Sequence, residues 1–136
     1  MSWIDPWGLS CRNSQKRFTK RDNITKRYVE LLTGKKPSEV ENQLLKNGWR
    51  VTFSQSNTPS KTQHVVFIKK TKAGGEYHLD YNPDGKTHNS DYWKVIKAND
   101  PIEKIYGRIG HDSFDGYDKI KNSPVYIDGK LMNSME

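Results

Sequence analysis

Hydrophobic residues in the first half of the chain recur every three or four positions, as on one face of a helix. The first such stripe predicts a helix over residues 22–32, closed by a glycine. The second predicts a helix that begins at Ser38, whose capping box closes on Glu41, and that ends at Gly48. The two stripes consist of Ile24, Tyr28, Leu31 and Leu32, and of Val40, Leu44 and Leu45.

After Gly48 the hydrophobic period changes to two, which is the spacing of a half-buried strand. A final hairpin is expected at Asp128-Gly129. The other predicted strands cover residues 49–53, 64–70, 76–81, 92–97 and 102–109. Helices followed by strands indicate an α+β fold. We expect two short N-terminal helices packed on a twisted antiparallel sheet of four to five strands.

The 136-residue chain is long enough for one compact domain and carries a net charge of +7. Hydrophobic residues make up only 32% of it, so the core is expected to be small. The single cysteine, Cys11, excludes an internal disulfide, and no apolar run has the length of a membrane helix. Positive charge is concentrated in residues 12–36. This suits a polyanionic partner, and equally a flexible arm or a solvated helix face.

The first residues contain the motif Asp5-Pro-Trp-Gly-Leu9, or D-P-x-G-L. It resembles the junction at the end of the core of Rhs-type polymorphic toxin proteins, in which a large shell cuts itself after the leucine and frees a toxin domain. The resemblance implies three segments: a junction remnant (residues 1–9), a basic linker (10–21) and a single toxin domain (22–136). The alternative is an ordinary Pro-Gly turn near a chain end.

The same resemblance implies a location and partners. It describes a secreted effector of interbacterial competition, delivered for example by type VI secretion to the cytoplasm of a target bacterium. Its partners would be the Rhs shell in the full-length protein and a cognate acidic immunity protein, since charge complementarity speeds association. No membrane partner is expected.

A second motif spans residues 81–94 and resembles a pattern in many Rhs and contact-dependent toxin tails. There, a strand ends in a Pro-Gly-Gly turn, followed by Arg-His and by Tyr-Tyr-Lys on the next strand. His88, Tyr92 and Lys94 match this pattern. The chain departs from it at Lys86, Thr87 and Trp93. Because a threonine stands where the pattern has arginine, no guanidinium role is carried over.

The order of elements also resembles the compact ribonuclease fold of barnase-like, EndoU-like, colicin-type and RelE-like toxins, so the expected fold is microbial-ribonuclease-like. RNA can be cut without a metal by its own 2′-hydroxyl, leaving a cyclic phosphate. The protein must then move two protons and stabilise phosphate charge. We therefore expect a metal-independent ribonuclease that needs no cofactor and blocks translation by cutting tRNA, rRNA or mRNA.

The candidate residues follow from these requirements. A histidine titrates near neutral pH, a lysine binds phosphate, and aromatic rings stack on unpaired bases. The predicted catalytic residues are His88, Lys94, Tyr92 and His78. The predicted RNA-binding residues are Lys86, Arg50 and Trp93.

Each candidate also has an ordinary structural interpretation. Tyr92 could belong to the core and Lys94 could be merely exposed, while His78 could lie on a solvated strand face instead of an open active face. His64 begins a strand and is interpreted as structural. His111 is either part of a turn, which we favour, or a second catalytic histidine.

Other chemistries have less support in the sequence. No metal-ligand spacing is present, and the motifs of serine hydrolases and zinc deaminases are missing. An ADP-ribosyltransferase that uses NAD is the main alternative, with Glu76 or Glu103 as its catalytic glutamate. The third possibility is a basic module that binds nucleic acid without catalysis.

Overall fold

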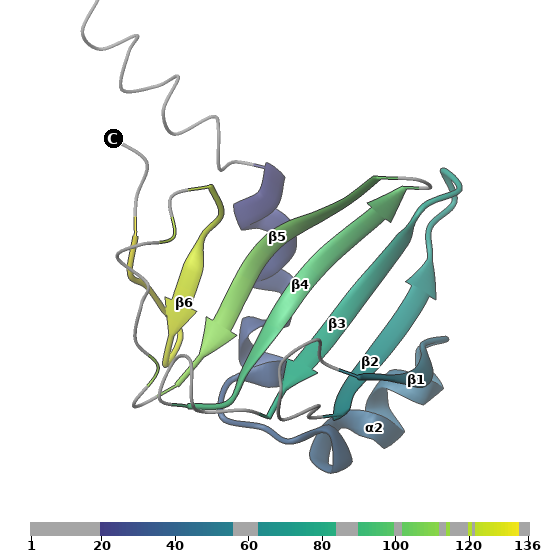
Figure 1. Cartoon of the computed structure of the whole chain (residues 1–136), viewed down its shortest axis with the longest axis horizontal. Coiled ribbons are helices and arrows are strands. Elements are labelled where there is room, and N and C mark those ends of the chain that lie inside the picture. Colours follow the sequence, from purple (N-terminus) through teal and green to yellow (C-terminus); the bar gives the residue numbers. More distant parts are fainter. Residues whose placement is uncertain are drawn as a thin grey trace, which may run out of the picture.

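The computed structural model describes residues 20–55, 63–83, 90–99, 102–111, 114, 120 and 122–133. A long helix covers residues 20–32, and a shorter one, α2, covers Pro37–Lys46. The strands are β1 (Arg50–Gln55), β2 (Gln63–Lys70), β3 (Glu76–Asn82), β4 (Tyr92–Asn99), β5 (Ile102–Gly110), β6 (Val125–Ile127) and β7 (Lys130–Leu131). Figure 1 shows them as one twisted sheet.

The strands lie side by side in chain order. Strands β1 to β5 form an antiparallel meander, β6 pairs with β5 in parallel, and β7 returns antiparallel to β6. Asp128 and Gly129 turn the chain between β6 and β7, both with positive φ (51° and 84°), so the hairpin predicted there is confirmed.

The predicted fold, a microbial-ribonuclease-like antiparallel sheet of four to five strands with helices packed on it, was wrong. The described chain forms a seven-stranded mixed sheet, and the sheet is its dominant part. Two features account for the error. Strands β6 and β7 have only three and two residues, too few to show alternation, and the parallel pairing of β5 with β6 leaves no local signal.

Helix boundaries also differ from the prediction. The long helix already includes Lys20 and Arg21, which the sequence assigned to the linker. Helix α2 begins at Pro37, because proline is favoured in the first helical turn. The backbone N–H of Lys36 donates to Glu39 Oε2 at 2.7 Å, so Glu39 and not Glu41 closes the cap.

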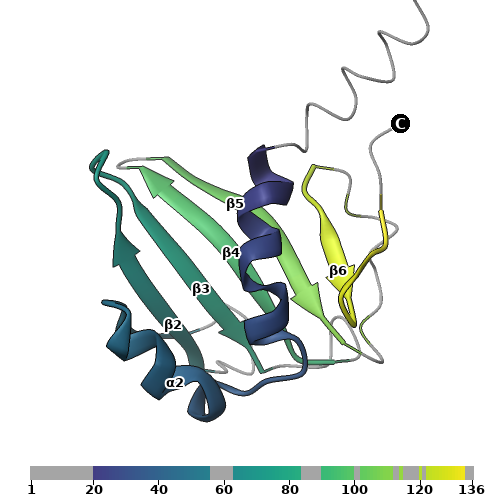
Figure 2. The same cartoon turned by 180° about the vertical axis from the view of Figure 1, so that it is seen from behind.

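Both helices lie across the same face of the sheet, as Figure 2 shows; we call it the helix face. Inward side chains from the helices and from β2 to β5 form the main core there. The long helix approaches β5 closely at Gly107, where an added Cβ would lie 2.1 Å from Thr25 Oγ1. The Thr25 hydroxyl donates to the Tyr106 carbonyl at 2.9 Å and fixes this contact.

No helix in the described residues covers the opposite side, which we call the open face (Figure 1). A second, smaller hydrophobic cluster covers one end of it. Tyr92 and Phe114 meet there with ring centroids 4.9 Å apart, and Val125 and Ile127 of β6 complete the cluster. The remainder of the open face, over β2 to β5, carries polar side chains between a few apolar ones.

Candidate functional site

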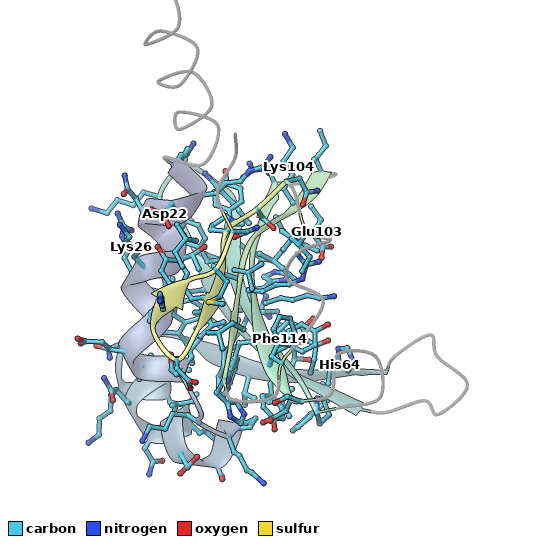
Figure 3. All side chains as sticks on the ribbon, turned by 90° about the vertical axis from the view of Figure 1, so that its left-hand side faces the viewer. Asp22, Lys26, His64, Glu103, Lys104 and Phe114 are labelled. Carbon is cyan, nitrogen blue, oxygen red and sulfur yellow. The ribbon has the colours of Figure 1, made fainter. Side chains whose placement is uncertain are left out.

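The polar residues of the open face form a row across three strands. The strand register places Asp80 of β3 opposite Lys94 of β4, and Lys94 opposite Arg108 of β5. Residues directly opposite each other in a sheet share one face. His64 of β2 reaches the same row, and Figure 3, an edge-on view, shows it on the side of the sheet away from the helices.

His64 and Asp80 form a histidine–carboxylate pair. The His64 Nδ1 lies 3.2 Å from Asp80 Oδ1, and only 17% and 15% of the two side chains are exposed. Burial raises the pKa of the Asp80 carboxyl, although His64 and Lys94 act in the opposite direction. With the proton on Nδ1, His64 donates to Asp80 and its Nε2 can accept a proton from another molecule.

Lys94 and Arg108 are two adjacent, half-buried cations. Burial lowers the pKa of Lys94, and the neighbouring Arg108 charge lowers it further. Among the described residues, no carboxylate lies within ion-pair distance of either cation. Arg108 donates to Ser123 Oγ at 3.3 Å, while its buried Nε has no hydrogen-bond partner in the described part of the chain. Such a pair suits an anion with several oxygens.

A second histidine–carboxylate pair lies further along β3. His78 Nε2 is 3.1 Å from Glu76 Oε1, and Arg50 of β1 donates to Glu76 Oε2 at 3.1 Å. The hydrogen bond from His78 lowers the pKa of Glu76, with a further contribution from Arg50. Glu76 thus already pairs with Arg50, the residue predicted to contact RNA.

A third histidine–carboxylate pair joins the beginning of β4 to the end of β5. His111 Nε2 lies 2.8 Å from Asp91 Oδ1, and the Tyr81 hydroxyl donates to Asp91 Oδ2 at 2.5 Å. Burial acts to raise the pKa of Asp91, but the hydrogen bonds from Tyr81 and His111 prevail and lower it. Tyr81 comes from the main core, so this pair fastens the sheet's end to the core.

The structure brings together only part of the predicted site. His78 and Lys94 lie on the open face. His78 is two positions from Asp80 along β3, and Lys94 lies directly opposite Asp80 on β4. Tyr92 shares that face but is only 8% exposed and packs in the second cluster, so its ring is not available for stacking. His88 and Lys86 lie outside the described residues.

The assignment of Trp93 to RNA binding was wrong. Its side chain is 2% exposed and lies on the helix face, where its indole N–H donates to the Lys35 carbonyl at 2.9 Å. Trp93 pairs with Tyr81 across the ladder, so it belongs to the inward row of β4, whereas Lys94 belongs to the outward row.

Sequence reasoning missed three members of the open-face row: His64, Asp80 and Arg108. Each occupies an outward position of its own strand, and that alternation was a usable signal. Their convergence depends on the register between β2, β3, β4 and β5, which local patterns do not reveal.

Among the described residues, no three side chains of His, Cys, Asp and Glu converge in a way that could hold a metal ion. Each of the three described histidines, His64, His78 and His111, is paired with a single carboxylate. In the same part of the chain, neither helix has the length and hydropathy needed to cross a bilayer.

Comparisons of the chain with protein-family models, with curated proteins and with solved structures give no match. The assignment of function therefore depends on the geometry of the open face and on the two sequence motifs.

Proposed function

We propose that the open face is the active site of a metal-independent endoribonuclease. The observation that carries this proposal is the half-buried pair of Lys94 and Arg108, directly opposite each other in the ladder and beside the His64–Asp80 pair. Like charges opposite each other destabilise a sheet. Asp80 lies opposite Lys94 but is already paired with His64, so the two cations can bind an anion with several oxygens. An RNA phosphate supplies that anion.

The roles follow from the contacts. His64, oriented by Asp80, removes the proton from a ribose 2′-hydroxyl, and the oxygen attacks the adjacent phosphorus. Lys94 and Arg108 stabilise the charge that develops on the phosphoryl oxygens. The bond to the 5′-oxygen breaks, and that oxygen takes a proton from His78, which lies on the same face of β3 as Asp80. The products are a 2′,3′-cyclic phosphate and a free 5′-hydroxyl.

The biological setting belongs to the same proposal. The motif at residues 5–9 supports a C-terminal toxin domain released from an Rhs shell, and the motif at residues 81–94 supports a toxin tail. We propose that the domain acts in the cytoplasm of a target bacterium and that an acidic immunity protein neutralises it. The net charge of +7 suits both an RNA substrate and an acidic inhibitor.

The test is incubation of the full chain with total bacterial RNA in EDTA. We expect discrete fragments that end in cyclic phosphate. Since general acid–base groups contribute about a hundredfold or more to rate, His64→Gln should lower the cleavage rate by at least about a hundredfold. Lys94→Met should cause a comparable loss, because it removes a cation that contacts the phosphate.

Two matched variants serve as controls. His111→Gln removes the histidine of the Asp91 pair, and Lys46→Met removes an exposed lysine of α2; both should cut RNA at the wild-type rate. His88→Ala examines the prediction made from the motif alone. Intact RNA with the wild-type chain, or equal losses in the controls and in His64→Gln, would show that the proposal is wrong.

A further inference from the structure

We propose that the helix face carries a second RNA-binding surface, separate from the active site. This surface, the lysine row, consists of Lys69, Tyr77, Lys97 and Lys104. Its ligand is the sugar–phosphate backbone of single-stranded RNA. The inference relies on RNA as the substrate class of the proposed function, but it does not depend on cleavage.

The lysine row is a continuous line across four strands. Lys69 of β2 lies opposite Tyr77 of β3, Tyr77 opposite Lys97 of β4, and Lys97 opposite Lys104 of β5. Lys97 Nζ lies 5.7 Å from the centroid of the Tyr77 ring. Tyr77 packs against the main core, so the row lies on the helix face. With strands about 4.8 Å apart, the row is about 14 Å long.

Lys69 and Lys97 contact aromatic rings, but no cation of this row forms an ion pair with a described residue. Lys97 and Lys104 are directly opposed like charges, an arrangement that destabilises a sheet. Among the described residues, no carboxylate lies within 4.0 Å of the ammonium of Lys69, Lys97 or Lys104, although other surface cations such as Lys26 do have such a partner. A polyanion across the row would relieve this repulsion.

Aromatic rings accompany the cations. Lys69 Nζ lies 6.0 Å from the Trp49 ring centroid. The guanidinium of Arg21 lies 5.8 Å from the ring centroid of Tyr106. The surface is hollowed at both ends of the row. A hollow of about 960 Å³ includes Lys69 and Tyr77 in its lining, and one of about 210 Å³ includes Lys97, Lys104 and Tyr106.

These features favour RNA over an acidic protein surface. Cations placed at strand spacing beside rings are the arrangement that binds a nucleic-acid strand, since the cations follow the phosphates and the rings contact bases or sugars. The half-buried Tyr77 also offers an edge for such contacts.

The position of the row has a consequence for substrate choice. The row and the proposed active site occupy opposite faces of the same strands, so a short oligonucleotide can occupy only one of them. A long RNA can bend around the sheet and reach both. The lysine row should therefore favour long single-stranded RNA over short oligonucleotides without changing the chemical step.

The experiment measures binding of a long, single-stranded 2′-O-methyl oligonucleotide, which has no 2′-hydroxyl for the cleavage reaction. The triple variant Lys69→Gln, Lys97→Gln, Lys104→Gln is compared by fluorescence anisotropy with Lys26→Gln, Lys36→Gln, Lys46→Gln. Both triples remove three positive charges. We expect at least about tenfold weaker binding for the row triple, and a log–log salt slope reduced by about 2, since each phosphate contact contributes about 0.7.

Two further measurements complete the test. Tyr77→Leu keeps the core apolar and should weaken binding without changing the salt slope, with the thermal unfolding midpoint as a check on folding. Cleavage of a dinucleotide by the row triple should match wild type. The wild-type chain could fail to cut RNA while the row triple still loses probe binding. That result would support the lysine row and refute the proposed ribonuclease.

Two outcomes would overturn the inference. Equal weakening in both triples would show that only net charge matters. If poly-glutamate displaces the probe as effectively as unlabelled RNA of the same charge, the row is a surface for acidic proteins instead.

Discussion

Individual charged residues on the open face oppose the stability of the fold. Asp80 and Lys94 are half-buried, and burial raises the pKa of the first and lowers that of the second. Both shifts mean that folding favours the neutral form of each side chain more than the unfolded chain does. Residues that reduce stability and lie together on an exposed face are typical of a functional site.

Replacing Lys94 should therefore stabilise the protein while it slows cleavage. Lys94→Met removes a cation opposite Arg108 and should raise the free energy of unfolding by up to about 1 kcal/mol at neutral pH. The folded pKa of Lys94 lies below the unfolded one, so wild-type stability rises with pH between these two values. The advantage of the variant should shrink in the same range.

Urea denaturation at neutral and alkaline pH measures this effect. Lys46→Met, which removes a lysine with no opposed cation, is the control and should change stability little at either pH. A Lys94→Met protein that is less stable than wild type at neutral pH would contradict the interpretation of Lys94 as a strained, functional cation.

At the scale of elements, the alternation within a strand could be predicted, but the contacts between strands could not. The pattern of Tyr77, Leu79 and Tyr81 identified β3, and the structure confirms their inward positions. In β4 both alternating sets contain large apolar residues, so the sequence left the inward set undecided. Trp93, which points inward, was therefore assigned to RNA binding. His64 and Arg108 join the site only through register.

The hydrogen bonds of Asp91 join the beginning of β4 to the end of β5, and their contribution to stability should depend on acid pH. Its hydrogen bonds to Tyr81 and His111 outweigh burial and keep the folded pKa of Asp91 below the unfolded value of about 3.9. The stability that Asp91 contributes is therefore complete above the unfolded pKa and is lost as the pH falls through the folded one.

Asp91→Asn tests this element. At neutral pH it should lower the free energy of unfolding by about 1 kcal/mol, because a charge-assisted hydrogen bond near the surface is screened by solvent. The difference from wild type should vanish in strong acid. Tyr81→Phe keeps the core ring but removes one hydrogen-bond donor to Asp91. Its free energy of unfolding should therefore fall less in acid than that of wild type. Parallel pH profiles for all three proteins would refute the assignment.

At the scale of the whole molecule, the two hydrophobic clusters lie on opposite faces of the sheet and stabilise different parts of it. The main core holds both helices and β2 to β5. The second cluster holds β6 against the open face through Phe114, which lies over Gly110 so closely that an added Cβ would be 2.9 Å from it. Only three residue pairs join β6 to β5.

This division predicts that the C-terminal strands open before the rest of the sheet, and that their opening disturbs the phosphate site. Ser123, just before β6, accepts a hydrogen bond from Arg108, and the Arg108 backbone N–H donates to the Pro124 carbonyl.

Phe114→Ala removes a side chain that is 3% exposed and should destabilise this cluster by about 3 kcal/mol. Amide hydrogen exchange should then accelerate in β6 and β7 while β3 and β4 stay protected. Because Ser123 then no longer holds Arg108, whose charge stabilises the transition state, kcat for RNA cleavage should fall more than KM rises. Leu79→Ala, in the main core, should instead accelerate exchange throughout β2 to β5. Uniform acceleration in Phe114→Ala would mean that the two clusters unfold as one unit, and Arg108 would then owe its position to the whole sheet and not to β6.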